Sequence, residues 1–257
     1  MDNTLKRPFF WKVRNRPVHF LGSLHFGPPG GFILPSSVLS VVKEASTITF
    51  EIPFDGPLDP SPLFRNSGSL EDDLSPLHWS ILTKMLANTE NLNRYRLEAL
   101  FLLLAPLPYQ ARGLIGKGLD PMLFDWARAN SKRILTLETR QEQIAIILKE
   151  CGDEISKHLA RCIDAPSLPL TRVDQVLAAM TSGDEGELAA LKETAFADLP
   201  RKAVHLFTER DVKWVPAFEA QCDSRDPALI IVGALHFAEP GGMLSLLRGR
   251  GYVIDRV

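Results

Sequence analysis

Four short apolar runs along the chain have the composition of buried β-strands. Each is rich in Val, Ile, Leu, Phe and Thr, which is typical of strands covered on both faces in a parallel sheet. The four runs are residues 18–24, 47–52, 133–138 and 228–233. A further run at 9–13 precedes the first across a polar turn, which predicts a hairpin, and a last strand is predicted at 252–257.

A helix is predicted between the first two buried strands. Pro35, Ser36 and Ser37 are suited to begin it, and Val38, Val41 and Val42 follow on one face. A strand, a helix and a second strand in succession imply parallel pairing with a right-handed crossover.

The middle of the chain, at about 77–222, has a helical pattern except for the strand at 133–138. The predicted helices cover residues 77–107, 122–130, 141–151 and most of 152–222, with breaks at 166–169, at 183–186 and near Pro200. Residues 53–75 are rich in Pro, Ser, Gly and Asp, which favours an irregular loop. We therefore predict one domain over residues 1–257, of the α/β (α+β) class, with a mainly parallel central sheet and a large helical layer.

Each buried run ends close to a polar residue capable of chemistry. These residues are His25, Glu51, Glu138 and His236. In a parallel sheet the carboxyl ends of the strands lie at one edge, which is where open α/β folds bind ligands. The four side chains are therefore expected to surround a common site.

Two of these residues lie in nearly identical turns. Residues 22–31 read GSLHFGPPGG and residues 233–242 read GALHFAEPGG, with seven of ten positions identical. Histidine is the commonest metal ligand and also serves as a general acid or base near neutral pH. A single histidine after a strand is more often a structural turn residue, but the repeated motif favours a shared functional site for His25 and His236.

Four other charged residues have both a functional and a structural interpretation. Glu51 and Glu138 stand at the ends of apolar runs, where a carboxylate must be paired or metal-bound unless it faces solvent. Asp120 precedes Pro121 and is most simply a helix cap. Arg210 lies among acidic neighbours in a helical stretch, so that taken alone it would be a surface charge.

Composition narrows the class of protein. The net charge of −2 gives no electrostatic reason to expect nucleic acid or an anionic membrane as a partner. The three cysteines cannot all pair within the chain and have no C-x-x-C spacing, which favours a reducing compartment. The chain shows neither a signal-peptide pattern nor an apolar run of ~20 residues, so we expect a cytoplasmic protein with no membrane span.

Taken together, these motifs resemble the TraB/GumN family, which includes the Tiki proteins. The resemblance rests on Phe9, Trp11, Val13, the two G-x-x-H turns, Glu51, Asp120, the 137–139 segment with Gln141 and Gln143 after it, the Glu209–Arg210 pair and the closing Gly251–Tyr252 strand. It covers nearly the whole chain. The chain differs from the usual family pattern at Ser23, where Thr is common, and at Asp211, where many members have Asn.

The resemblance implies a fold similar to that of erythromycin-esterase and ChaN-like proteins, and a metal-dependent protease activity using manganese or cobalt. It implies that His25, Glu51 and His236 form the metal or catalytic centre and that Arg210 is the family's arginine. We therefore expect a metal-dependent hydrolase acting on a peptide or small-molecule substrate. Its catalytic residues would be Glu138, Arg210 and Asp120, with Glu51 or Glu138 as the proton acceptor.

A second hypothesis comes from a different class of protein. The protein could instead be a non-enzymatic binding protein that holds a small ligand, a peptide or a haem-like group at the same edge of the sheet, as the ChaN-like relatives suggest. The residues alone leave both hypotheses open.

Overall fold

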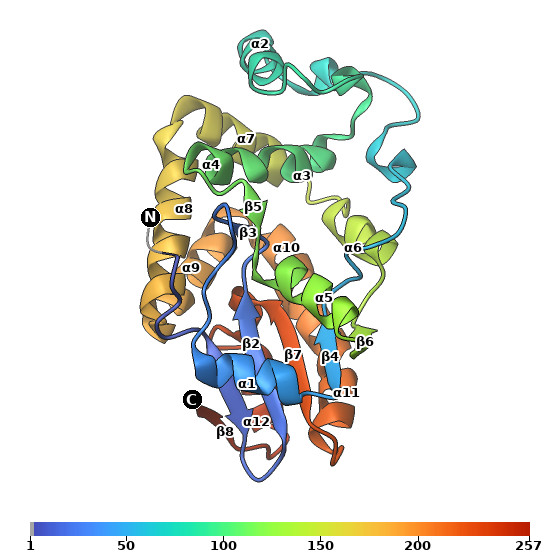
Figure 1. The fold of residues 1–257 in the computed structure, drawn as a ribbon. Coiled ribbons are helices and arrows are strands. Elements are labelled where there is room, and N and C mark those ends of the chain that lie inside the picture. The colour runs from blue at the N-terminus through green and yellow to red at the C-terminus, as the bar shows by residue number, and fades with distance from the viewer. Residues whose placement is uncertain (1–2) are drawn as a thin grey trace.

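The computed structural model describes residues 3–257, and within these residues a six-stranded sheet forms the centre of the molecule (Figure 1). The strand order is β6-β4-β7-β2-β1-β8. The bounds are β1 Phe10–Val13, β2 Val18–Ser23, β4 Thr47–Phe50, β6 Arg133–Thr136, β7 Ala228–Gly233 and β8 Ile254–Arg256. The four strands β6, β4, β7 and β2 are parallel, whereas β1 and β8 are antiparallel to their neighbours. The predicted α/β class with a mainly parallel sheet is confirmed.

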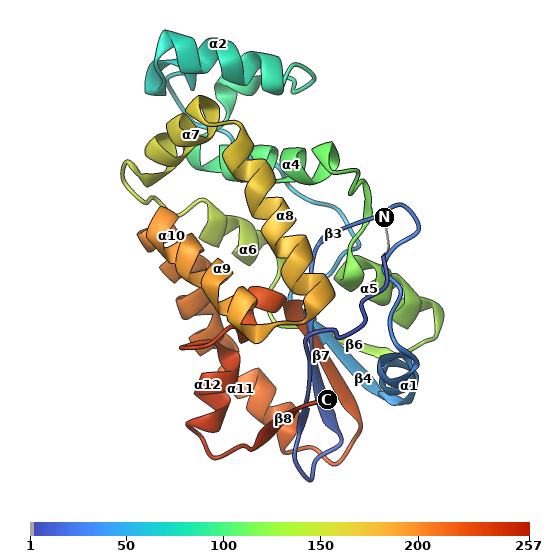
Figure 2. The same ribbon diagram turned by 90° about the vertical axis from the view of Figure 1, so that its left-hand side faces the viewer.

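Helices cover both faces of this sheet. Figure 2 shows α1 (Ser36–Glu44) and α5 (Leu119–Ala129) on one side, and α11 (Glu209–Cys222) and α12 (Met243–Arg248) on the other. On the α11 side, Phe20 of β2 packs against Phe218 and Phe237, with ring centroids 5.4 and 5.9 Å away. Because both faces are covered, the central strands are apolar at successive positions, as the sequence pattern indicated.

The predicted helical layer lies beyond the carboxyl ends of the parallel strands (Figure 1). It consists of α2 (Pro76–Met85), α3 (Leu100–Leu104), α4 (Pro106–Ala111), α6 (Arg140–Ile147), α7 (Glu154–Asp164), α8 (Ser167–Ser182), α9 (Glu185–Asp198) and α10 (Pro200–Ala203). The layer has its own apolar cluster, in which Leu70, Leu82, Leu100 and Leu159 are buried. None of the helices among residues 3–257 is long and apolar enough to cross a bilayer.

A two-stranded ribbon connects the helical layer to the first G-x-x-H turn. It pairs β3 (Phe26–Gly27) with β5 (Gly116–Lys117) in antiparallel orientation. Gly118 follows β5 and packs so closely on the turn that a Cβ there would lie 2.0 Å from the Leu24 carbonyl oxygen. Only glycine fits this contact, and it brings the start of α5 against the turn.

Several predicted boundaries are wrong. The helix predicted at 77–107 breaks after Met85, where 3₁₀ turns Leu92–Arg94 and Leu97–Ala99 intervene. Asn91 has φ of 56°, a left-handed conformation that asparagine tolerates and a helix does not.

The strands predicted at 47–52 and 133–138 end two residues earlier, at Phe50 and Thr136. Their pairing nevertheless continues, because Glu138 N donates to the Glu51 carbonyl at 2.9 Å. The last strand is Ile254–Arg256 and is also shorter than predicted.

Candidate functional site

The four polar residues predicted at the strand ends all lie at the carboxyl edge of the sheet. His25 and His236 follow β2 and β7, which pair in parallel with Ser23 opposite Gly233, so the two turns leave the sheet side by side. Glu51 directly follows β4, and Glu138 lies two residues after the end of β6. Glu51, Glu138 and His236 are buried, whereas the His25 side chain exposes 46% of its surface.

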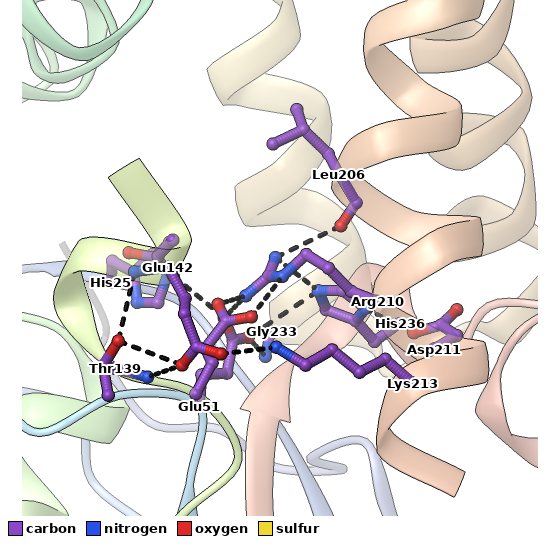
Figure 3. A network of polar contacts seen from close by, with 12 residues as sticks. His25, Glu51, Thr139, Glu142, Leu206, Arg210, Asp211, Lys213, Gly233 and His236 are labelled. Atoms are coloured by element: carbon purple, nitrogen blue, oxygen red, sulfur yellow. Dashed lines mark hydrogen bonds and ion pairs between the residues drawn. The ribbon is translucent and has the colours of Figure 1, made fainter. Parts of the chain in front are cut away.

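Arg210 of α11 links the two glutamates. Its Nη2 lies 2.6 Å from Glu51 Oε2 (Figure 3). The same Nη2 lies 2.6 Å from Glu138 Oε1, and Nε donates to Glu138 Oε2 at 3.3 Å. The guanidinium is buried and lies 4.4 Å from the centre of the Trp214 ring. The interpretation of Arg210 as a surface charge is therefore wrong, because packing of α11 against the sheet edge buries it between two carboxylates.

Glu51 also accepts a short hydrogen bond from the second G-x-x-H turn. The backbone N–H of Gly233 donates to Glu51 Oε1 at 2.6 Å. A Cβ at Gly233 would lie 3.1 Å from that oxygen, so the glycine of the second motif makes room for the carboxylate. Burial alone would raise the pKa of Glu51, but the Arg210 cation and the neighbouring imidazoles hold it well below its usual range. Glu51 is therefore ionised.

Glu138 has the opposite tendency. Burial raises the pKa of its carboxyl, and this outweighs the opposing effect of Arg210. Its backbone is fixed by the helix that begins next to it: Thr139 is the N-cap of α6 and forms a capping box with Glu142 (Figure 3). The two glutamates thus share one arginine but differ in their affinity for a proton.

His236 is held on one side by an aspartate and faces Arg210 on the other. Its Nδ1 lies 2.6 Å from Asp211 Oδ1, and Asp211 is fully buried. Its Nε2 lies 3.2 Å from Arg210 Nη1 and 3.8 Å from Glu51 Oε1. The Trp214 ring covers the imidazole at a centroid distance of 4.6 Å.

His25 has an equivalent partner on the other side of the sheet. Its Nδ1 lies 2.5 Å from Oδ2 of Asp120, which is buried in the first turn of α5. The Asp120 carboxylate raises the pKa of His25 to about 9. The prediction that Asp120 caps this helix is wrong: the helix begins at Leu119 with Gly118 as its N-cap, and the Asp120 side chain is directed to the histidine instead.

Comparison with known families agrees with these motifs. The model of the TraB/PrgY/gumN family matches residues 9–256, nearly the whole chain. The chain belongs to the TraB/PrgY/gumN family. No curated protein and no solved structure is significantly similar to it.

The two histidines of this TraB/PrgY/gumN chain have matching surroundings. Each has Nδ1 against a buried aspartate that a neighbouring helix supplies, Asp120 from α5 and Asp211 from α11. In metal sites, a carboxylate bonded to one imidazole nitrogen orients the ring and leaves the other nitrogen for the metal. The donor set of two imidazoles and the Glu51 carboxylate suits manganese, zinc or iron.

The chemistry of these side chains suits a metal ion, but their spacing does not. Among residues 3–257, no three His, Cys, Asp or Glu side chains are gathered closely enough to form a metal site as they stand. Arg210 Nη1 lies against the Nε2 of His236, the nitrogen that would face an ion. Metal binding at this TraB/PrgY/gumN site therefore requires that the guanidinium move away from His236.

Sequence reasoning missed the role of Asp211. It was visible only as a departure from a family pattern, since an aspartate beside an arginine in a helix resembles an ordinary surface pair. Trp214 was also missed, although its spacing of four from Arg210 places both on one helix face. Ser23, the other departure, is buried, and its hydroxyl has no hydrogen-bond partner among residues 3–257.

Proposed function

We propose that this TraB/PrgY/gumN chain is a metal-dependent hydrolase with peptides as its substrates. The observation that carries the proposal is the repeated arrangement of a histidine backed by a buried aspartate, once in each G-x-x-H turn. Two such imidazoles beside an ionised glutamate form a donor set suited to a divalent cation, whose binding would displace the proton that His25 carries at neutral pH. His25, Glu51 and His236 are the residues proposed to hold the cation, manganese and cobalt being the first candidates.

A divalent ion in such a site supplies Lewis acidity and lowers the pKa of a bound water from ~15.7 toward ~7. The residues of the chain supply the remaining functions. Asp120 and Asp211 orient the two imidazoles, and Arg210 keeps Glu51 in its anionic form.

Glu138 is the proposed proton acceptor. Its raised pKa matches a carboxylate that takes up a proton from an attacking water, whereas the lowered pKa of Glu51 suits a permanently charged ligand. The two glutamates are therefore assigned different roles.

Arg210 is the proposed stabiliser of the negative charge that develops on the substrate oxygen. Its Nε and Nη2 are held by carboxylates, whereas the polar partners of Nη1 within residues 3–257 are the Leu206 carbonyl and His236, both at 3.2 Å. Nη1 is thus the nitrogen that can donate to an anionic oxygen once it leaves His236.

The test combines metal analysis with a peptide-library cleavage assay on protein purified without chelator. We expect about one equivalent of bound metal and chelator-sensitive cleavage, with both lost in His25→Ala and His236→Ala. His78→Ala, which removes a histidine of the remote helix α2, is the matched control and should change neither.

Unchanged metal content and cleavage in both site variants would contradict the proposal. Tight, stabilising ligand binding with no turnover by the metal-loaded wild type would instead favour the non-catalytic binding protein.

A further inference from the structure

The helical layer contains an apolar cavity that the proposed hydrolase site does not use. Its volume is about 610 Å³, within the range of about 300–1,000 Å³ common for ligand pockets. Its lining residues come mainly from α2, α3, α4, α7 and α8, and none of the residues proposed for the hydrolase site is among them.

Most of the cavity wall is aliphatic or aromatic. Leu100, Phe101, Leu104, Leu159 and Val173 are among the side chains that line it. A wall of this kind favours an alkyl chain, because it offers no hydrogen-bond partners to the middle of a polar ligand.

The charged groups of the wall are Arg172 and Asp198, with His158 and Cys162 as further polar groups. Asp198 is shared by two guanidiniums: Arg172 Nη2 lies 3.4 Å from Oδ2, and Arg161 Nη1 lies 3.1 Å from Oδ1. Burial, and then Arg161, lower the pKa of His158, so the imidazole stays neutral and adds no charge. Two guanidiniums share one carboxylate, so this group of three side chains carries one positive charge in excess.

Arg172 also has an unused hydrogen-bond donor. Its Nε is buried and has no hydrogen-bond partner among residues 3–257. Nη1 donates to Gln175 and Nη2 to Asp198, so the guanidinium keeps further N–H donors, that of Nε among them, without an acceptor among residues 3–257. A buried, charged donor without an acceptor is costly, and an anionic ligand oxygen would satisfy it.

We propose that this cavity binds a single-chain fatty acid, with the alkyl chain along the apolar wall and the carboxylate on Arg172. The excess positive charge and the unpaired Nε favour an acid over a neutral lipid. The site adjoins the first G-x-x-H turn without being part of it, since the Tyr109 ring in the cavity wall stacks on Phe26, next to His25, at 4.5 Å.

The test is displacement of a fluorescent fatty acid from the full chain by saturated acids of increasing length and by tetradecanol. Affinity should rise about fourfold for each added methylene that the cavity accommodates, and tetradecanoate should bind more tightly than tetradecanol. Arg172→Met should weaken tetradecanoate binding about tenfold while leaving tetradecanol binding unchanged.

Arg112→Met is the matched control, because Arg112 pairs with Asp174 and does not line the cavity. Leu104→Trp and Ala105→Phe should each abolish binding by filling the space, and two positions are used in case one variant fails to fold.

Three results would overturn the proposal: equal affinity for the acid and the alcohol, unchanged acid binding in Arg172→Met, or full binding in a folded variant with a filled cavity. Equal affinity would assign the cavity to a neutral ligand.

Discussion

At the scale of single residues, the site is a set of buried charges that all have partners. Arg210 lies between Glu51 and Glu138, while Asp211 and Asp120 each hold one histidine. A buried ion pair adds little net stability, but removing one partner leaves an uncompensated buried charge. Substitutions that break a pair are therefore expected to have larger effects than those that preserve its hydrogen bonds.

Replacing Arg210 tests this charge balance. Arg210→Met leaves the carboxylates of Glu51 and Glu138 without their cation, and we expect the free energy of unfolding at neutral pH to fall by about 3–5 kcal/mol. Urea unfolding measures the loss. The double variant Arg210→Met, Glu138→Gln should recover part of it, because one of the two charges is gone. A loss below about 1 kcal/mol in the single variant, the range of exposed pairs, would show that the network is not buried in solution.

Asp211 tests the orientation of His236. Asp211→Ala removes the acceptor for Nδ1 and should weaken manganese binding by about 10–100-fold, the usual effect of losing such a partner. Asp211→Asn keeps an acceptor oxygen and should restore most of the affinity. Isothermal titration calorimetry measures the manganese affinity of both variants. Equal affinities of the Ala variant and the wild type would show that Asp211 does not orient His236 for metal binding.

The sequence identified the main residues of the site but not the aspartates that hold its histidines. The duplicated turns identified His25 and His236, and strand-end positions identified Glu51 and Glu138. The partners were harder to find, because Asp120 and Asp211 lie in helices where an aspartate is normally a cap or a surface charge. Their burial depends on how α5 and α11 pack on the sheet, which local sequence does not determine.

At the scale of elements, single side chains hold the ends of helices next to the site. Lys202 is fully buried, and its Nζ donates to the carbonyls of Ile147 at 2.6 Å and Lys149 at 2.8 Å. These carbonyls lie at the C-terminal end of α6, the helix that begins beside Glu138. A lysine in this position satisfies carbonyl groups that the helix leaves unpaired.

Lys202→Met should therefore destabilise the protein by about 1–3 kcal/mol, because the buried Ile147 carbonyl and the partly buried Lys149 carbonyl lose their donor. Chemical denaturation measures the change. Lys157→Met is the control, since its side chain is 74% exposed in a surface pair with Asp153, and it should shift stability by less than about 0.5 kcal/mol. Equal effects of the two substitutions would contradict the capping role.

His19, in the hairpin of β1 and β2, should make the stability of the protein depend on pH. Burial first, and Lys12 second, lower the pKa of His19 from 6.5 to about 4, and its ring stacks on Phe10. Between these two values the unfolded chain binds a proton that the native state excludes, so the contribution of His19 to stability falls as pH falls. His19→Gln should flatten this part of the stability profile between pH 6.5 and 4, as measured by denaturation at a series of pH values. A profile as steep as that of the wild type would assign the loss to other groups.

Element boundaries show where sequence patterns were sufficient. The parallel strands were predicted because they are continuous apolar runs, and the helices of 152–222 because Pro and Gly mark the breaks between them. The prediction of one helix at 77–107 was wrong. The apolar residues of its second half pack within the helical layer, but the chain turns at Asn91 before it reaches them.

At the scale of the whole molecule, a parallel sheet delivers four side chains to one edge and the helical layer lies beyond that edge (Figure 1). The parallel arrangement of the strands could be predicted because strand–helix–strand units allow few arrangements, whereas the strand order, with β7 between β2 and β4, was not predicted. The contact of Arg210 with both glutamates could not be predicted, because it depends on packing between segments separated by 159 and 72 residues. The result is a TraB/PrgY/gumN chain whose two G-x-x-H turns meet beside a buried carboxylate pair.

Titration of the metal-free protein with cobalt(II), followed by visible absorption, shows directly whether the two G-x-x-H turns form a metal centre. We predict saturation at one equivalent, with a spectrum typical of nitrogen and oxygen ligands, and loss of that spectrum in His25→Ala and in His236→Ala but not in His78→Ala. The same spectrum in the wild type and both site variants, or no binding by the folded wild type, would contradict a metal centre formed by the two turns.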